Sequence, residues 1–330
     1  AVSISGSPIT LGSTTYTSTT GLLSFTGAVN LPNGGLIVAV TSGGGAGDDI
    51  TFSSTVSGVN TFNLDAGASG IITISGAVAG GLVTLNGTGA TINVDAVTSA
   101  GSITLRSDDI ALSGALNATA GINFYTRIGT ATMGIGGGAG AYQLSDVEIA
   151  LLGAAATIRI GENSAGLNPQ SGLITLQTVA LPAGVDAAAI EIDSESGAGG
   201  VVLDDNGSGQ PTALSTNTGS IAISAGTTGI AATQATAGGS PNDAEIGTTG
   251  AVTLDSGGII GSLANRIQFI AAQDQVSVIN GPGGVFLNGL NVFTYASIVS
   301  GGGNIDVTTT AGNLTGVTAT SGAGTINLNA

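Results

Sequence analysis

The chain of 330 residues contains no Cys, no His and no Trp, and it also lacks Lys, so that four Arg are its only basic side chains. Without His or Cys, neither a Ser-His-Asp nor a Cys-His catalytic arrangement can form, and a thiolate or imidazole zinc site is excluded as well. Without Lys, no Schiff base can form. We therefore expect a protein that is not an enzyme.

Positive charge is scarce. Four Arg stand against 20 acidic residues, which gives a formal net charge of −16. Such a chain repels nucleic acid and gains little from an anionic membrane surface. It also has no run of about 18 uninterrupted apolar residues. We expect no nucleic-acid partner and no membrane insertion, and the absence of Cys fits a secreted bacterial protein.

The residues that are present favour a folded, Gly-rich chain. Hydrophobic residues make up 42% and Gly accounts for 58 positions, with only 7 Pro and no Gly-X-Y period. This composition is too apolar for ordinary disorder and does not match collagen.

A short unit recurs along the chain: an apolar residue, a small or polar residue, and a second apolar residue. This alternation is typical of β-strands, with the outer pair facing a core. The unit occurs at 50–52, 62–64, 72–74, 83–85, 92–94, 103–105, 110–112 and 122–124, and again at 158–160, 174–176, 190–192, 221–223, 252–254, 267–269, 276–278, 305–307 and 326–328.

The spacing of these units indicates a solenoid. Copies begin at 62, 83, 103 and 122, and a second set begins at 72, 92 and 110 between them. Gly, Asn, Asp and Ser fill the joints, as turns require. A period of roughly 20 residues with two short strands per repeat predicts an all-β fold, a parallel β-helix (β-solenoid). A β-propeller needs longer repeats and fits less well.

One segment, near 127–156, interrupts the pattern. It contains a Gly-rich run at 134–140, followed by Ser145 and Glu148 at the spacing of a capping box. We predict a short helix over about 146–152 within an insertion, and loops at 161–172 and 233–250. Composition does not shift sharply anywhere, so residues 1–330 are expected to form a single elongated domain.

Three stretches of the chain resemble the repeats of large secreted surface proteins of the filamentous haemagglutinin type. They are DDITFSSTVSGVNTFNLDAGASGIITISG (48–76), residues 101–161 with the order DDI, IGGGAG, LSDVE and IRIG, and the C-terminal run 301–330. The resemblance implies a right-handed parallel β-helix on, or shed from, a Gram-negative outer surface. Members of that family are adhesins, biofilm components or stalks. Their secretion domain carries an Asn-Pro-Asn-Gly-Ile-like motif, from which Asn30-Leu31-Pro32-Asn33-Gly34-Gly35 departs, so no secretion domain is assigned.

Three Asp pairs are the first candidates for chemistry: Asp48-Asp49, Asp108-Asp109 and Asp204-Asp205. Glycosidases need two carboxylates about 5–10 Å apart. Neighbouring residues of a strand point to opposite faces, so one pair alone does not converge. We interpret the pairs as turn-capping residues, for which Asp is well suited, and assign no catalytic residue.

Calcium is the one metal that the sequence suggests. Asp204, Asp205 and Asn206 lead into a Gly-rich turn, Gly207-Ser208-Gly209, whose oxygens suit a hard cation. The alternative is a plain acidic turn. No other cofactor is expected.

Two further features have structural alternatives. Arg106 and Asp108 could share a strand face, either as a lyase base with its partner or as a surface ion pair, and we favour the ion pair. Phe124, Tyr125 or Tyr16 could stack on a sugar ring, although packing within the fold is the commoner role of single aromatics.

Together these features predict an extracellular structural or adhesive β-solenoid of a bacterial surface, matrix or filament. Self-association through the open edges of the end rungs, and contact with surface glycans or host receptors, are the expected partnerships. The alternatives are a carbohydrate-active β-helix enzyme and a passive glycan-binding module.

Overall fold

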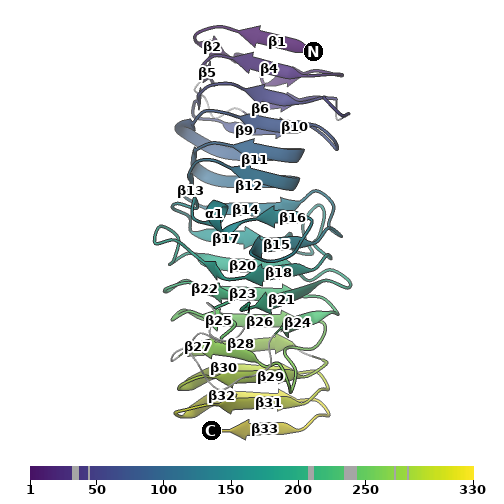
Figure 1. The fold of residues 1–330 in the computed structure, drawn as a ribbon, viewed down its shortest axis with the longest axis vertical. Coiled ribbons are helices and arrows are strands. Elements are labelled where there is room, and N and C mark those ends of the chain that lie inside the picture. The colour runs from purple at the N-terminus through teal and green to yellow at the C-terminus, as the bar shows by residue number, and fades with distance from the viewer. Residues whose placement is uncertain (32–36, 44, 207–211, 234–243, 271–272, 281) are drawn as a thin grey trace. The chain divides into compact units, whose positions relative to one another are not determined.

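The computed structural model describes residues 1–31, 37–43, 45–206, 212–233, 244–270, 273–280 and 282–330. Parallel β-strands dominate it, and strands distant in sequence pair side by side in coils of the chain (Figure 1). This confirms the predicted all-β parallel β-helix with one short helix. The chain divides into two compact units. Unit 1 comprises 1–128 and 150–158, and unit 2 comprises 129–149 and 159–330.

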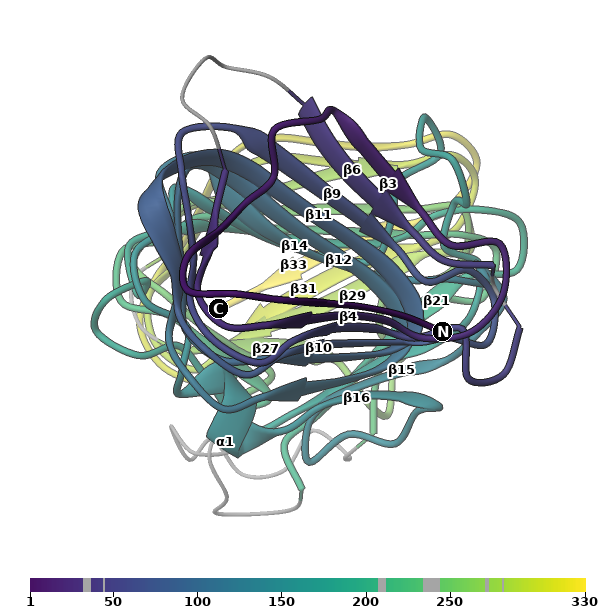
Figure 2. The same cartoon turned by 90° about the horizontal axis from the view of Figure 1, so that it is seen from above.

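The first three rungs of unit 1 contain three strands each rather than the expected two, because a two-residue strand separates the two longer ones, and in the next rungs β11 and β12 run on without this division. In Figure 2, β1 and β4 follow one wall of the coil, and β3, β6 and β9 follow another. Its strands are β1 (Val2–Ser5), β2 (Ile9–Thr10), β3 (Thr15–Thr17), β4 (Leu23–Thr26), β5 (Val29–Asn30), β6 (Ile37–Thr41), β7 (Ile50–Phe52), β8 (Val56–Ser57), β9 (Thr61–Asp65), β10 (Ile71–Ile74), β11 (Val78–Val94), β12 (Val97–Leu112), β13 (Leu116–Ala118) and β14 (Gly121–Thr126).

Apolar columns form the core of unit 1. Ile50 pairs with Ile72, Ile72 with Ile92, and Ile92 with Ile110, and all four side chains are buried. The few aromatic residues also contribute to this core. The rings of Phe25 and Phe52 stack at 4.6 Å on adjacent rungs, a contact that adds to the burial of their large apolar surfaces.

Unit 2 has the same parallel pairing. Its elements are β15 (Met133–Gly136), β16 (Tyr142–Leu144), α1 (Asp146–Ile149), β18 (Ile174–Gln177), β19 (Val179–Ala180), β20 (Ala189–Ser194), β21 (Gly200–Asp204), β22 (Leu214–Ser215), β23 (Ile221–Ala225), β24 (Gly229–Ala232), β25 (Ile246–Gly247), β26 (Val252–Ser256), β27 (Ile267–Ile270), β28 (Gln273–Asn280), β29 (Val285–Gly289), β30 (Phe293–Ser300), β31 (Ile305–Thr309), β32 (Leu314–Ser321) and β33 (Ile326–Asn329). The chain crosses between the units at 128/129, 149/150 and 158/159, and the last crossing falls within β17 (Thr157–Ile160).

Rung length varies in unit 2. Ile190 pairs with Ile221, and Ile221 with Val252, so these rungs are much longer than the rung that joins Val285 to its partner Ile305. The period predicted from the sequence therefore holds for part of the chain only. The longer rungs arise because connections between strands lengthen while the paired strands keep their size.

The insertion expected near 127–156 is partly regular sheet. Met133–Gly136 is a buried strand that pairs with β18, so part of the Gly-rich run belongs to the sheet. The helix starts as predicted, since the backbone N–H and hydroxyl of Ser145 both donate to Glu148 Oε2, at 2.8 and 2.7 Å. It ends at Ile149 rather than 152, because Leu152 returns to a parallel bridge with Leu116.

The predicted loop at 161–172 is confirmed as non-strand, with a turn at its centre. The second predicted loop, 233–250, falls largely on residues 234–243, outside the described part of the chain, and its end forms β25.

Candidate functional site

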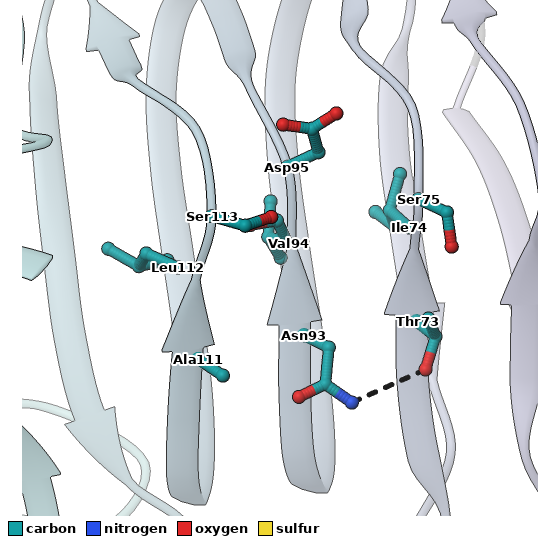
Figure 3. Close-up of a pocket in the computed structure, with 9 residues that line it drawn as sticks. All are labelled: Thr73, Ile74, Ser75, Asn93, Val94, Asp95, Ala111, Leu112 and Ser113. Carbon is teal, nitrogen blue, oxygen red and sulfur yellow. Dashed lines mark hydrogen bonds between the residues drawn. The ribbon is translucent and has the colours of Figure 1, made fainter.

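A hollow of about 400 Å³ lies on unit 1, across the ends of β10, β11 and β12 (Figure 3). Three successive rungs each contribute the last outward-facing residue of the strand, the last core residue and the first turn residue. The lining residues are Thr73, Ile74 and Ser75, then Asn93, Val94 and Asp95, then Ala111, Leu112 and Ser113.

The depth of the hollow follows from one small side chain. Thr73 pairs with Asn93, and Asn93 with Ala111, so these three form one outward column. Asn93 Nδ2 lies 3.4 Å from Thr73 Oγ1, and Asn93 Oδ1 points toward Ala111 (Figure 3). Because Ala111 has only a methyl group and is exposed, the surface falls away beside the Asn93 amide.

Polar turn residues border this hollow on one side. Ser75 and Ser113 are exposed and Asp95 is half-buried between them. Their backbones are fixed by the rungs, since Asp95 N donates to Ile74 O at 3.0 Å and Ser113 N to Val94 O at 2.9 Å. The hollow thus presents one carboxylate, one amide and three hydroxyl groups, and all nine lining residues are without positive charge.

A second polar cluster, the acidic cluster of Arg159, Glu191, Asp193, Glu195 and Asp255, lies on unit 2. The Arg159 guanidinium bonds Glu191 on another strand and lies 3.7 Å from Asp193 Oδ2. Asp193 is 8% exposed. Burial, together with the charges of Glu191 and Glu195, raises its pKa to about 6, against the attraction of Arg159.

Asp255 belongs to the same column as Asp193. Asp193 pairs with Ser224, and Ser224 with Asp255. Desolvation, helped by Glu195, raises the pKa of Asp255. Two rungs place the two strand positions about 10 Å apart, near the upper limit for paired catalytic carboxylates. Burial and the Arg159 contact give Asp193 a structural role instead.

Asp193 and Asp255 are not among the candidates chosen from the sequence, although their position in the sequence pattern could have identified them. Both follow an apolar-x-apolar unit directly, as do Asp65, Asp95 and Asp204. The residue after the last core position faces outward and then meets the turn, so an Asp there stacks with its equivalents on neighbouring rungs.

The Asp pairs chosen from the sequence do not converge. Asp49 stands opposite Ile71, Ile71 pairs with Thr91, and Thr91 with Asp109. Three rungs separate the two carboxylates by about 14 Å, which is too far for a glycosidase pair. Asp49 Oδ1 instead accepts a hydrogen bond from Ile71 N at 2.8 Å.

Asp48 is a corner residue as expected. Its carboxylate accepts hydrogen bonds from the backbone N–H groups of Gly21 and Gly45, and these bonds lower its pKa, the Gly21 bond most. The Gly21 bond connects adjacent turns of the coil, so the interpretation of this Asp as a turn-capping residue agrees with the structure.

The Arg and aromatic candidates have packing roles. Asp108 forms an ion pair with Arg127, at 2.6 Å. Arg106 lies over the Tyr125 ring at 5.0 Å and donates to Thr126 O at 3.4 Å. Phe124 is fully buried, and Tyr16 packs edge-on against Phe25. A sugar platform is therefore excluded for Phe124.

The residues proposed for calcium are consecutive in the chain, but their side chains have different surroundings. Asp204 Oδ2 accepts from Gln177 Nε2 at 2.6 Å, and its Oδ1 accepts from Thr233 Oγ1 at 2.8 Å and from Asn206 N at 2.9 Å. Asp205 is 1% exposed. The remaining oxygens, from Gly207-Ser208-Gly209, lie outside the described residues, so calcium binding stays a prediction. Residues 32–35, the end of the segment compared with the secretion motif, also lie outside them.

No protein-family model, no curated protein and no solved structure matches this chain. The described residues also contain no helix of the length and apolarity that a membrane span requires. The class of protein that the fold itself defines is the parallel β-helix, or β-solenoid.

Proposed function

We propose that this protein is an extracellular structural or adhesive β-solenoid of a bacterial surface, matrix or filament, without enzymatic activity. The observation that carries the proposal is the continuous parallel pairing within each unit. Apolar columns stack from rung to rung, and most strands pair on both sides. Such a structure resists local opening, because each strand is held by its neighbours and by the core beneath it.

Self-association is part of this proposal. Ile326 and Leu328 of β33 continue the column of Ile305 and Val307, which are fully buried, yet they are 45% and 44% exposed. An exposed strand edge with apolar side chains is a template for pairing with another chain. We propose that copies associate through open rung edges of this kind.

Light scattering over a concentration series tests the self-association. We expect a mass that rises with concentration and persists in high salt, because backbone pairing and apolar contact are weakly screened. Leu328→Lys should reduce it, whereas Leu167→Lys, which makes the same change at a loop position that is 88% exposed, serves as the control. A monodisperse monomer at every concentration would contradict the proposal.

The resemblance to filamentous haemagglutinin-type proteins supports a bacterial outer surface or its surroundings as the location. Antibody labelling of intact cells, with the culture medium assayed in parallel, tests this. Signal confined to the interior of lysed cells would contradict secretion.

A carbohydrate-active enzyme is the weaker alternative. Its best carboxylates, Asp193 and Asp255, belong to the acidic cluster, in which Arg159 contacts Asp193 and Asp193 is buried. Turnover of acidic or neutral polysaccharides by the purified protein would overturn the non-enzymatic proposal.

A further inference from the structure

We propose that the hollow beside Ala111 binds a neutral saccharide, as one unit of a longer polysaccharide chain. The proposal rests on the adhesive role above and specifies its site and the chemical class of its ligand. It is carried by three features of the hollow: its open shape, its hydrogen-bonding groups and its place at the end of a polar column.

The hydrogen-bonding groups suit a polyol. The Asn93 Nδ2 group is directed to Thr73, which leaves Oδ1 as an acceptor facing the hollow. The Asp95 carboxylate is an acceptor with two oxygens, Ser75 adds a hydroxyl that can donate or accept, and the Ser113 hydroxyl, which donates to Val94 O at 3.4 Å, keeps its lone pairs as acceptors. Vicinal sugar hydroxyls supply the donors that Asn93 and Asp95 need. The methyl group of Ala111 offers a small apolar floor for sugar C–H groups.

The charge of the site selects against ionic ligands. Asp95 is the one charged side chain among the nine lining residues, on a chain of net charge −16. An anionic polysaccharide is repelled by both. A polycation would be attracted to acidic residues all along the chain rather than to this hollow. A neutral saccharide is therefore the class of ligand whose binding depends on the hydrogen-bonding groups of this hollow.

A polar column extends from the hollow along successive rungs. Asn93 pairs with Thr73, Thr73 with Thr51, Thr51 with Ser24, and Ser24 with Ser3. The residues repeat at about 4.8 Å along the stacking direction. A polymer lying on this column can use several weak contacts at once, so its affinity exceeds that of a single sugar.

The test is calorimetric titration of the purified protein with cellohexaose, maltohexaose, mannohexaose and, as the anionic probe, hexagalacturonate. We expect at least one neutral hexasaccharide to bind and the anionic one not to bind. Asp95→Asn removes the charged acceptor and should weaken binding by about tenfold, the effect of losing one hydrogen bond to a charged group. Ala111→Leu places a larger side chain in the hollow and should weaken binding by at least as much, because the side chain occupies the space of the sugar.

Matched controls separate the site from the fold. Ala231→Leu makes the same change at an exposed strand position of β24 in unit 2. Asp65→Asn makes the same charge change at an exposed turn of unit 1, where Asp65 caps Gly67 N. Both should bind as the unmodified protein does. Absence of binding to every neutral hexasaccharide at millimolar concentration, or full binding by Ala111→Leu, overturns the site. Light scattering on the same preparation reports self-association independently, so failure of the site is distinguished from failure of the proposed function.

Discussion

At the scale of single residues, the fold depends on positions where a Cβ atom cannot be accommodated. Gly27 has φ of +122°, and a Cβ there would collide with the carbonyl oxygen of Gly6 on the preceding rung. Only Gly combines this dihedral with such a close approach. Gly12, by contrast, has no heavy atom within 4 Å of its Cβ position.

We expect Gly27→Ala to destabilise the protein by at least about 1–3 kcal/mol, the cost of a strained dihedral alone. Gly12→Ala should be neutral within about 0.5 kcal/mol. Chemical denaturation followed by circular dichroism measures both. Equal stability of the two variants would contradict the rung contact between Gly27 and Gly6.

The buried Asp193 makes stability depend on pH. Its pKa is raised from 3.8 to about 6 in the folded protein, so the folded state holds this proton more tightly than the unfolded state does. The stability that it contributes is therefore complete below about pH 3.8 and is lost as pH rises through about 6. The difference is on the order of 2–3 kcal/mol.

Asp193→Asn should flatten this dependence. Thermal unfolding compared at pH 5 and pH 7.5 gives the measurement, with Asp109→Asn, at an exposed position, as the control that keeps the dependence. If the melting temperatures of the unmodified protein and of Asp193→Asn change equally between those pH values, the buried carboxylate does not hold its proton as described.

At the scale of elements, the strands are defined by pairing on both sides. Thr104 in β12 stands opposite Asn86 of β11 and Asn123 of β14. Asn123 Nδ2 donates to Thr104 Oγ1 at 3.1 Å. Loss of the side chain removes one partly buried hydrogen bond, whereas loss of the N–H interrupts the ladder.

Thr104→Pro should therefore cost about 3 kcal/mol or more, and Thr104→Ala about 1 kcal/mol or less. Urea unfolding of the two variants checks the contrast. If Pro is tolerated as well as Ala, β12 is not an interior strand.

Sequence periodicity predicts most long strands because the apolar-x-apolar unit reflects a physical requirement, a core residue on each side of an outward one. The prediction fails for strands that lack this unit and are recognised only by their hydrogen-bonded pairing with neighbouring strands. The two-residue strands β2, β5 and β8 carry a single core residue each, and β15 is buried although two of its four residues are Gly.

The candidate site was less predictable. The hollow depends on Ala111 standing in register with Asn93 of the preceding rung, and that register is known only once rung lengths are known. The acidic cluster likewise depends on the long rung that brings Ser224 opposite Asp193, which the shorter period of the first half of the sequence does not anticipate.

At the scale of the whole molecule, cations are few and each is engaged. Arg127, Arg159 and Arg266 form ion pairs with acids on other strands, and Arg106 is 9% exposed. With no Lys, these four Arg are the only trypsin targets. Arg106 lies within β12 and Arg159 within β17, so cleavage there requires several paired residues to open together, and Arg127 and Arg266 directly adjoin β14 and β27.

We therefore expect the native protein to survive trypsin under conditions in which the denatured protein is cut after all four Arg. Mass spectrometry of a time course measures this. Rapid cleavage of native protein after Arg106 or Arg159, the two that lie within strands, would contradict the continuous pairing on which the proposed structural role depends.

Electron microscopy of the native protein without added partners tests the central claim most directly. A self-associating structural β-solenoid predicts long filaments with a regular axial repeat. Isolated particles with no end-to-end contacts, at concentrations where light scattering is also flat, would contradict the structural-filament account.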